Sequence, residues 1–404
     1  RKLKEQELAD LITDFDIIIA GTEPITDYVL ERATNLKLIV RVGIGLDSLD
    51  LLGARRRGIQ VSYTPDSPSP AVAEMTIGLM IALLRSMYIS NSRIRQGEWL
   101  RYFGRRLSEI AIGIIGVGRI GGRVVRLLTA FDCSHIIVND IDPRFELPKY
   151  PGCMIEKVNK ETIYREADII SLHVPLTART RNLITKKELC MMKRDALIIN
   201  TARGGIVNEQ DLFEILKSGH LGGAALDVFE EEPEIHASLL SSPKTIVTPH
   251  IAGSTVEAQS KVGYEIAVQI SNYLNDGVIL NAINFPSMTP KEVEDLQHYV
   301  RVGEKLGSFI GQICKIRISG IGIRYYGELS EVNYKPVSNY ILKSILKPIL
   351  TEEINEVNAR NYAKERGIAV IETVSSRERS YSNLISIQLR SPQQMEWIEG
   401  AVLR

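Results

Sequence analysis

A chain of 404 residues is too long for one ordinary hydrophobic core, so we expect two or three domains. Hydrophobic residues make up 44% of the chain and charged residues 24%, which is typical of a soluble globular protein. Its 49 acidic residues balance 49 basic ones, which argues against nucleic acid or a membrane surface bound through bulk charge. The longest apolar run, residues 75–84, is shorter than the roughly 18 residues that span a bilayer, and no secretory leader is found.

The four cysteines, at positions 133, 153, 190 and 314, share no CxxC spacing. Such isolated cysteines are typical of reduced residues in a cytosolic protein rather than of disulfides or a metal site. We therefore expect a cytoplasmic protein without a bound metal ion.

Short apolar strands alternate with helical stretches, a pattern typical of parallel sheets covered on both faces. In the first segment the expected strands are Asp16–Ala20, Leu38–Val42 and Ile59–Ser62, and the expected helices are Thr26–Ala33, Leu51–Arg57 and, after a proline-rich turn, Ala71–Arg85. In the second segment the expected strands are Ile110–Ile115, Ile136–Asn139, Ile169–His173, Leu197–Asn200, Gly223–Asp227 and Ile246–Thr248. The second series predicts a complete doubly wound domain.

A helix expected at Ser254–Asn275 leads back toward the first segment, which predicts a discontinuous domain of residues 1–85 and 254–285 around a domain of residues 86–253. In residues 286–404 the expected strands and helices are mixed differently, and this segment is assigned to a third, α+β domain. Its expected elements are a helix at Lys291–Phe309, a strand-rich stretch at Lys315–Glu328, helices within Ser338–Arg366, and strands at Ile368–Glu372 and Asn383–Leu389.

A glycine-rich stretch, Gly116-Val117-Gly118-Arg119-Ile120-Gly121, follows a predicted strand and opens a helix. Glycines there let the backbone approach a pyrophosphate, whose charge is stabilised by free amides at the helix N-terminus. Asp140 ends the next strand, 19 residues beyond Gly121, and would accept hydrogen bonds from the adenosine ribose while repelling a 2′-phosphate. The pattern predicts NAD rather than NADP. Asp142 is the alternative ribose acid, and a tight turn with a solvated carboxylate is the alternative without a ligand.

Three polar residues, Arg203, Glu232 and His250, each come just after a strand of the second series, at the sheet edge where ligands bind in such folds. Hydride transfer from a 2-hydroxy acid needs a base for the hydroxyl proton and a cation for the carboxylate and developing carbonyl. A carboxylate behind the base would fix its tautomer. Singly, the three could be a surface loop, a solvated acidic run and a strand cap. Their shared position predicts a catalytic set.

These motifs occur together in one known family. Residues 16–390 resemble the D-isomer-specific 2-hydroxyacid dehydrogenases, and within them the D-3-phosphoglycerate dehydrogenases. The shared stretches are Arg41–Asp47, the turn into Ala71–Glu74, Gly116–Gly121, Asn200–Gly205, Leu226–Pro233 and Pro249–Gly253. The resemblance implies an α/β protein with a discontinuous flavodoxin-like substrate domain, a Rossmann-type NAD domain and a C-terminal α+β intervening domain of allosteric type, which we expect to be incomplete at Arg404.

The resemblance also implies roles for single residues. His250 would be the acid/base, Glu232 its partner, and Arg203 the ligand of the substrate carboxylate and oxo group. Further substrate contacts would come from Val42, Gly43 and Arg101. Cofactor contacts would come from Gly116, Gly118, Arg119, Ile120, Gly121, Asp140, Val174, Thr201, Ala202, Arg203, Asp227, His250 and Gly253. The helix at Ala71–Arg85 resembles a dimerisation element, so a homodimer or homotetramer is expected.

The implied activity is NAD-dependent oxidation of D-3-phosphoglycerate to 3-phosphohydroxypyruvate in L-serine biosynthesis. One position departs from the family: the arginine that usually grips the phosphate is replaced by Ala20, and such a bidentate contact is not easily replaced. Arg101, which in relatives comes from a neighbouring subunit, and Arg41 are the other basic candidates. Two alternatives stay open: a dehydrogenase or reductase for another D-2-hydroxy acid or 2-oxo acid, and a non-enzymatic NAD-sensing scaffold.

Overall fold

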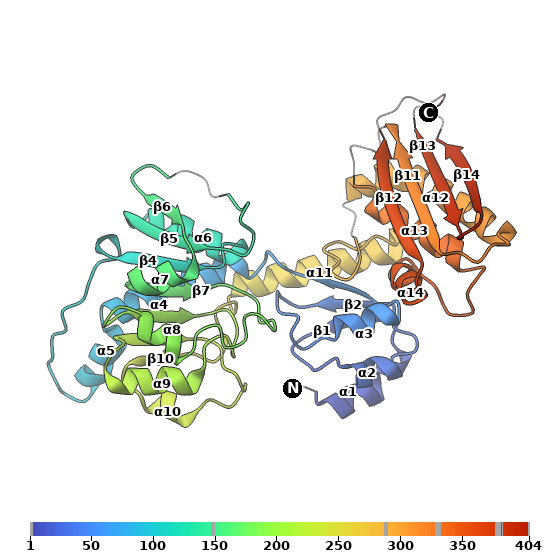
Figure 1. Cartoon of the computed structure of the whole chain (residues 1–404). Coiled ribbons are helices and arrows are strands. Elements are labelled where there is room, and N and C mark those ends of the chain that lie inside the picture. The colour runs from blue at the N-terminus through green and yellow to red at the C-terminus, as the bar shows by residue number, and fades with distance from the viewer. Residues whose placement is uncertain are drawn as a thin grey trace. The chain divides into compact units, whose positions relative to one another are not determined.

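The structure is a computed structural model, and it describes residues 3–146, 150–286, 290–327, 333–375, 381 and 383–402. The chain divides into two compact units (Figure 1). One unit comprises residues 65–262, and the other comprises residues 1–64 together with 263–404. The boundary falls inside one long helix, α11 (Val256–Asp276).

Residues 65–262 form a doubly wound α/β domain around a seven-stranded sheet of order β10-β9-β8-β7-β4-β5-β6. All its strand pairs are parallel. The strands are β4 Ala111–Ile115, β5 His135–Asn139, β6 Met154–Lys157, β7 Ile169–Leu172, β8 Leu197–Asn200, β9 Gly223–Leu226 and β10 Thr245–Val247. The helices are α4 Ser69–Leu84, α5 Met87–Arg95, the 3-10 turn Leu107–Glu109, α6 Arg119–Thr129, α7 Lys160–Glu166, α8 Lys186–Met191, α9 Glu209–Ser218 and α10 Ala237–Ser241. The strand order reverses between β4 and β7, and ligands bind at such a switch point.

This sheet has a hydrophobic core on each face. Ile112 and Ile114 of β4 pack with α4 and α6, whereas Ile115 packs with residues of α7, α8 and α9. Successive residues of a strand point to opposite faces, so a sheet buried on both sides needs uninterrupted apolar strands. The six predicted strands of this series are confirmed for that reason. The seventh, β6, was not predicted, because its residues are mostly exposed and carry no apolar run.

The predicted domain boundary at residue 85 is wrong. Helix α4 was assigned to the first segment, but its Ile77, Met80 and Leu83 lie in the same core as Ile112 and Val124 of the seven-stranded domain. The helix is apolar on nearly all sides, so its sequence pattern does not indicate which core it joins. Within the described residues no single helix is long and apolar enough to span a membrane, although α4 and α5 together, bent by 62°, pass that test by length and composition.

The N-terminal lobe of the other unit holds a three-stranded parallel sheet of order β1-β2-β3. All three predicted strands are confirmed, as are the helices between them. The elements are α1 Glu5–Leu11, a 3-10 turn Ile12–Asp14, β1 Ile17–Ala20, α2 Asp27–Arg32, β2 Leu38–Arg41, α3 Leu51–Arg56 and β3 Gln60–Tyr63. The return segment after α11 joins this lobe, because Asn284 bonds the backbone of β3 on both sides: its Oδ1 accepts from Val61 N–H and its Nδ2 donates to Ile59 O.

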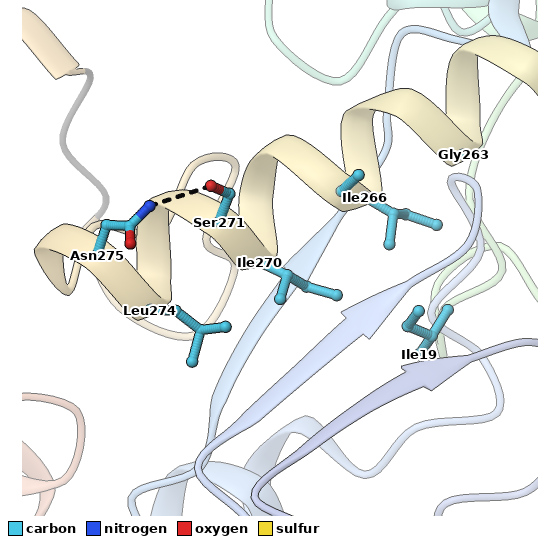
Figure 2. A pocket seen from close by; sticks show the side chains of 8 residues that line it. Ile19, Gly263, Ile266, Ile270, Ser271, Leu274 and Asn275 are labelled. Carbon is cyan, nitrogen blue, oxygen red and sulfur yellow. Dashed lines mark hydrogen bonds between the residues drawn. The ribbon is translucent and has the colours of Figure 1, made fainter.

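An apolar groove of about 500 Å³ lies between β1 and α11. Figure 2 shows Ile266, Ile270 and Leu274 on the side of α11 that faces Ile19 of β1, with Ser271 and Asn275 bonded to each other at 3.2 Å. No ionisable side chain lines this groove. It therefore offers neither an acid, a base nor a cation for chemistry.

The C-terminal lobe is α+β, as predicted, with its own core. Its sheet has the order β12-β11-β13-β14, parallel between β11 and β12 and antiparallel elsewhere, and helices cover one face (Figure 1). The elements are α12 Pro290–Ile313, β11 Gly320–Tyr326, α13 Lys335–Leu346, α14 Ala359–Glu365, β12 Ala369–Ser375, β13 Leu384–Arg390 and β14 Met395–Ala401. The predicted strand-rich stretch Lys315–Glu328 has its last residue, Glu328, outside the described residues.

Polar contacts between described residues join this lobe to the N-terminal lobe. Asn355 Nδ2 donates to Gly58 O at 2.9 Å, and Gln60 Nε2 donates to Glu356 Oε1 at 2.8 Å. Gly58 has a φ of 72°, and a Cβ on it would lie 1.9 Å from Asn355 Nδ2. Contact with Asn355 therefore needs a glycine at position 58.

Candidate active site

The three predicted catalytic residues lie at one edge of the seven-stranded sheet. Arg203, Glu232 and His250 follow β8, β9 and β10, which are parallel neighbours. The carboxyl ends of neighbouring parallel strands meet at the same edge, where ligands bind in open α/β sheets. The sequence predicted this common edge, and the structure brings the three residues there.

His250 and Glu232 form the central pair of the site. His250 Nδ1 lies 2.7 Å from Glu232 Oε2, and Glu232 Oε1 accepts a hydrogen bond from the Phe229 backbone N–H at 3.1 Å. A carboxylate at Nδ1 favours the tautomer protonated there, so Nε2 is the nitrogen that can exchange a proton with a ligand. The two side chains are 44% and 35% exposed, which leaves the pair accessible from solvent.

The carboxyl of Glu232 is held in its charged form. Burial alone raises its pKa, but hydrogen bonds from His250 and from Phe229 N–H, together with the charges of His250 and Arg203, outweigh burial and lower the pKa below the ordinary 4.5. Glu232 is therefore ionised at neutral pH and can stabilise a protonated imidazole. The influence of Arg203 on this pKa also shows that the three side chains share one electrostatic environment.

The backbone at His250 adopts an unusual conformation that a buried carboxylate maintains. Its φ of 55° is left-handed, which costs roughly 1–2 kcal/mol for a residue with a Cβ. Asp227 is fully buried, and its Oδ1 accepts from the Thr248 hydroxyl at 2.5 Å and from Ile251 N–H at 2.9 Å. Its Oδ2 accepts from Ala252 N–H at 2.8 Å. Asp227 thus fixes the turn that presents His250. This structural role of Asp227 was not predicted from the sequence. The predicted contact of Asp227 with a cofactor stays a prediction.

Arg203 lies in a tight turn that a second buried polar residue organises. Asn200, at the end of β8, donates from Nδ2 to Arg203 O at 2.8 Å, and its Oδ1 accepts from Ala202 N–H at 3.1 Å. A Cβ on Gly204 would lie 1.8 Å from Phe229 O, so the loops after β8 and β9 touch along a backbone that only glycine permits. The sequence identified Asn200 only as a strand end. Its one signal was a polar residue closing an apolar strand.

The glycines of the 116–121 loop serve two different purposes. A Cβ on Gly116, whose φ is 93°, would lie 2.4 Å from His173 O, and a Cβ on Gly121 would lie 1.9 Å from Gly116 O. These two glycines are required by packing inside the protein. Gly118 differs, because nothing lies within 4 Å of where its Cβ would be. The open space beside Gly118 fits a ligand that approaches the backbone closely.

The start of α6 also fits an anionic ligand. Its N-cap residue, Gly118, offers no side chain to the first turn, so the amides of Arg119 and Ile120 remain for a pyrophosphate. Asp140 directly follows β5 and accepts from Val117 N–H at 2.7 Å through Oδ2, which ties the predicted ribose acid to the glycine loop. Open space, helix amides and a carboxylate are the three features that a dinucleotide site needs.

The remaining predicted cofactor residues surround the same edge. A Cβ on Gly116 would lie 2.9 Å from Val174 Cγ1, so Val174 packs against the glycine loop. Thr201 follows β8, and its hydroxyl lies 3.0 Å from that of Thr76 on α4. Gly253 closes the turn after His250. Direct contacts of these residues with a cofactor stay predictions.

His173 is the other histidine at this edge, and it is unsuited to acid–base work. Its Nε2 lies 2.9 Å from Ser171 Oγ, and burial lowers its pKa to about 4. It is therefore neutral at pH 7. Of the two histidines, His250 is the one that can exchange protons with a ligand.

The amides predicted to bind the substrate carboxylate are already engaged. Val42 N–H donates to Ala20 O at 2.9 Å, and Gly43 N–H donates to Thr64 Oγ1 at 2.7 Å. Arg101 lies in the exposed segment after α5. The contacts of all three with a substrate stay predictions.

This arrangement defines a class of protein. A doubly wound sheet with a dinucleotide loop, and with a histidine–carboxylate pair and an arginine at the same edge, is the layout of a nicotinamide-dependent dehydrogenase for a small hydroxy acid. Among the residues that the structure describes, no group of three or more His, Cys, Asp or Glu side chains could hold a metal ion.

Comparison with known proteins gives the same class. Residues 77–252 match the NAD binding domain of D-isomer specific 2-hydroxyacid dehydrogenase, and residues 295–404 match the D-3-phosphoglycerate dehydrogenase intervening domain. The D-3-phosphoglycerate dehydrogenase of Methanocaldococcus jannaschii is 37% identical over 99% of this chain and 76% of its own length. That of Bacillus subtilis is 33% identical over 94% of this chain and 72% of its own. The hydroxypyruvate reductase of Thermotoga maritima is 39% identical over 66% of this chain and 88% of its own.

Solved structures agree. A glyoxylate reductase from Paecilomyes thermophila superposes with a TM-score of 0.64 at 30% identity, over 70% of this chain and 89% of its own. The D-lactate dehydrogenase from Aquifex aeolicus, complexed with NAD and lactic acid, superposes with a TM-score of 0.61 at 26% identity, over 69% of this chain and 90% of its own. The chain belongs to the D-isomer specific 2-hydroxyacid dehydrogenase family. It is an NAD-dependent oxidoreductase, as the sequence predicted.

Proposed function

We propose that the protein oxidises D-3-phosphoglycerate to 3-phosphohydroxypyruvate with NAD, as a step of L-serine biosynthesis. The observation that carries the chemistry is the 2.7 Å contact between His250 and Glu232 on the sheet edge that also bears the dinucleotide loop. The choice of substrate is supported by the D-3-phosphoglycerate dehydrogenases that match this chain almost from end to end, intervening domain included.

In this proposal His250 Nε2 accepts the proton of the substrate hydroxyl while the carbon–hydrogen bond at C2 breaks. Glu232 stabilises the imidazolium that forms, and it is suited to this because its lowered pKa keeps it charged. The Arg203 guanidinium binds the substrate carboxylate and the oxygen that becomes a carbonyl. Bound NAD would supply the hydride acceptor, held by the Gly118–Ile120 backbone and Asp140. In the reverse direction His250 returns the proton.

A second candidate is reduction or oxidation of another 2-oxo or 2-hydroxy acid. It is favoured by the buried Ala20 at the end of β1, where a phosphate-binding arginine was expected, and by the similarity to a hydroxypyruvate reductase. Arg41 does not fill the gap. Its guanidinium donates to Gly45 O at 2.7 Å, Val42 O at 2.6 Å and Ala20 O at 3.2 Å, so it shapes the loop after β2.

A panel of D-2-hydroxy acids decides between the two candidates. The purified full chain is assayed for NADH formation with D-3-phosphoglycerate, D-glycerate, D-lactate and D-2-hydroxyglutarate. We expect kcat/KM to be at least tenfold higher for D-3-phosphoglycerate than for D-glycerate, which differs from it by the phosphate. Equal values would reject the phosphorylated substrate, and no turnover of any D-acid would favour an NAD-binding scaffold.

We also propose that the protein is a cytoplasmic homodimer or homotetramer. The segment from α5 to Leu107 supports self-association, because it presents a group of large exposed side chains: Trp99 is 77% exposed, Leu100 53% and Phe103 fully exposed. Apolar patches of this kind mark contact surfaces. Light scattering should give a dimer or larger for the wild type and a smaller species for Phe103→Ser, and a monomeric wild type would contradict the proposal.

A further inference from the structure

The two acidic residues beside the glycine loop already have partners within the protein. Asp140 accepts from Val117 N–H at 2.7 Å through Oδ2 and from Asp142 N–H at 3.0 Å through Oδ1. Asp142 Oδ1 accepts from the backbone N–H of Arg144 at 2.9 Å and from its Nε at 3.1 Å, and Oδ2 accepts from Nη2 at 3.3 Å. Asp140 therefore shapes the loop, whereas Asp142 is paired with a cation.

A second cation lies near Asp142. Lys157 ends β6, the strand beside β5, and its ammonium bonds Phe145 O and lies 4.3 Å from the centroid of the Phe145 ring. Hydrogen bonds from Arg144, and to a smaller extent the charge of Lys157, hold the pKa of Asp142 below its ordinary 3.8. The charges of Asp140 and Asp142 are thus balanced by those of Arg144 and Lys157.

These four side chains lie at the sheet edge that bears the glycine loop. Strands β4, β5 and β6 are parallel neighbours, so their carboxyl ends meet. Backbone and side-chain bonds tie these ends together: Gly116 N–H donates to Asn139 O at 2.8 Å, and Asn139 Nδ2 donates to Val158 O at 2.7 Å. In a dinucleotide site of this kind, the adenosine ribose lies at the end of the second strand.

A phosphate on that ribose would meet balanced charge rather than a lone carboxylate. An unpaired acid at this place repels a 2′-phosphate, and a nearby arginine accommodates one. The side chains of Arg144 and Asp142 are 87% and 48% exposed, and an ion pair so exposed is weakly held. The guanidinium can therefore turn from Asp142 to a phosphate, which it binds bidentately.

We propose that the cofactor site accepts NADP as well as NAD, with Arg144 and Lys157 binding the 2′-phosphate of the adenosine ribose. The inference rests on the proposed placement of the cofactor at the Gly116–Gly121 loop. NAD binding remains possible in the same site, because each carboxylate oxygen has a further lone pair for a ribose hydroxyl. The protein would then exchange hydride with either nicotinamide cofactor.

The test is direct binding of NADH and NADPH to the full chain, followed by nicotinamide fluorescence at constant ionic strength and without any hydroxy acid. In the wild type, Kd for NADPH should be within tenfold of Kd for NADH. Arg144→Gln should weaken NADPH binding about tenfold and Lys157→Gln about threefold, the cost of one charge-assisted contact each, while NADH binding stays within twofold.

Two further variants serve as controls. Arg126→Gln removes a positive charge from the last turn of α6, away from the helix N-terminus, and should leave both Kd values within twofold. Gly118→Val places a side chain in the open space beside the loop and should weaken both cofactors. If Gly118→Val changes neither Kd, the cofactor lies elsewhere, and the placement and this proposal fail together.

The remaining outcomes concern the 2′-phosphate. Loss of NADPH affinity in Arg144→Gln and Lys157→Gln, with NADH unaffected, supports the proposal. A wild-type Kd for NADPH more than tenfold above that for NADH overturns it, as does equal loss in Arg144→Gln and Arg126→Gln, which means diffuse attraction. Both Arg144 and Lys157 are exposed, so their replacement should not impair folding. Because no hydroxy acid is present, the result does not depend on which substrate the protein oxidises.

Discussion

The sheet edge after β8–β10 and the loop after β2 both serve the proposed reaction, but they are built in opposite ways. At the sheet edge, Asp227 and Asn200 are buried anchors that hold the turns after β10 and β8, and Glu232 accepts from the Phe229 backbone N–H as well as contacting His250. In the loop after β2, the amides of Val42 and Gly43 are themselves bonded within the protein. In the proposed reaction, the first region holds the residues proposed to transfer the proton, whereas the second does not identify the substrate.

The largest effect should come from removing the base at the sheet edge. We expect His250→Ala to lower kcat by about 10³-fold with every D-2-hydroxy acid that the wild type accepts, because general acid–base catalysis contributes roughly 10²–10⁴. NAD affinity, measured by fluorescence titration, should change little. His298→Ala, an exposed histidine on α12, is the matched control and should retain full activity. Unchanged turnover in His250→Ala would remove the base assignment.

The partner of the base should matter less, and in a pH-dependent way. Glu232→Gln keeps the shape but loses the charge behind His250, and we expect kcat at pH 7 to fall about 10²-fold. Because the folded-state pKa of Glu232 is lowered, its charge stabilises the folded protein fully above pH 4.5, and that contribution is lost as the pH falls through the lowered value.

Urea unfolding at pH 7 and pH 4 checks the sign of this effect. Part of the wild type's loss of stability on acidification should be absent in Glu232→Gln. Glu231→Gln, at an exposed neighbouring position, should follow the wild type in both rate and stability. A Glu232→Gln variant with normal kcat would show that the contact at 2.7 Å orients nothing.

Cofactor selectivity tests which carboxylate near the glycine loop binds the ribose of the cofactor. Asp140→Ala should weaken NAD binding about tenfold and narrow the preference for NAD over NADP, because the ribose hydroxyls lose an acceptor and a 2′-phosphate loses a repelling charge. Asp142→Ala is the natural control. If it shifts selectivity and Asp140→Ala does not, Asp142 is the ribose acid. Ratios of kcat/KM with the two cofactors measure the effect.

The smallest effect should appear at the substrate's far end and should depend on the substrate. Arg101→Gln should raise KM for D-3-phosphoglycerate up to about tenfold, the cost of one charge-assisted hydrogen bond, and leave kcat within twofold. KM for D-glycerate should not change. Arg106→Gln, an exposed arginine paired with Glu109, is the control. An equal rise for both substrates would place Arg101 away from the phosphate.

Most of the framework could be predicted because burial and sequence pattern coincide in it. The strands of the seven-stranded sheet are buried on both faces, so continuous apolar runs marked six of them. Strands β6 and β14 were not predicted, because the residues of β6 are largely exposed and those of β14 show only a weak alternation between buried and exposed positions. Helix α4 was assigned to the wrong domain because a helix that is apolar all round fits either core.

For the candidate site, the common sheet edge of Arg203, Glu232 and His250 could be predicted, but the buried residues that support it could not. Arg203, Glu232 and His250 each follow a strand, and strand ends can be recognised in a sequence. The hydrogen bonds of Asp227 depend on the conformation of the turn after β10, and those of Asn200 depend on the conformation of the loop after β8. Neither conformation is indicated by a local sequence pattern.

The contact between Gly58 and Asn355 has an evolutionary consequence. A left-handed φ of 72° alone would admit asparagine as well as glycine, but the carboxamide of Asn355 leaves no room for a Cβ. In homologues that retain the C-terminal lobe and an asparagine at the position of Asn355, position 58 should be invariant glycine. In homologues that have lost the lobe, asparagine should appear there. The residue at position 58, which lies outside the C-terminal lobe, would then indicate whether a homologue has kept or lost that lobe.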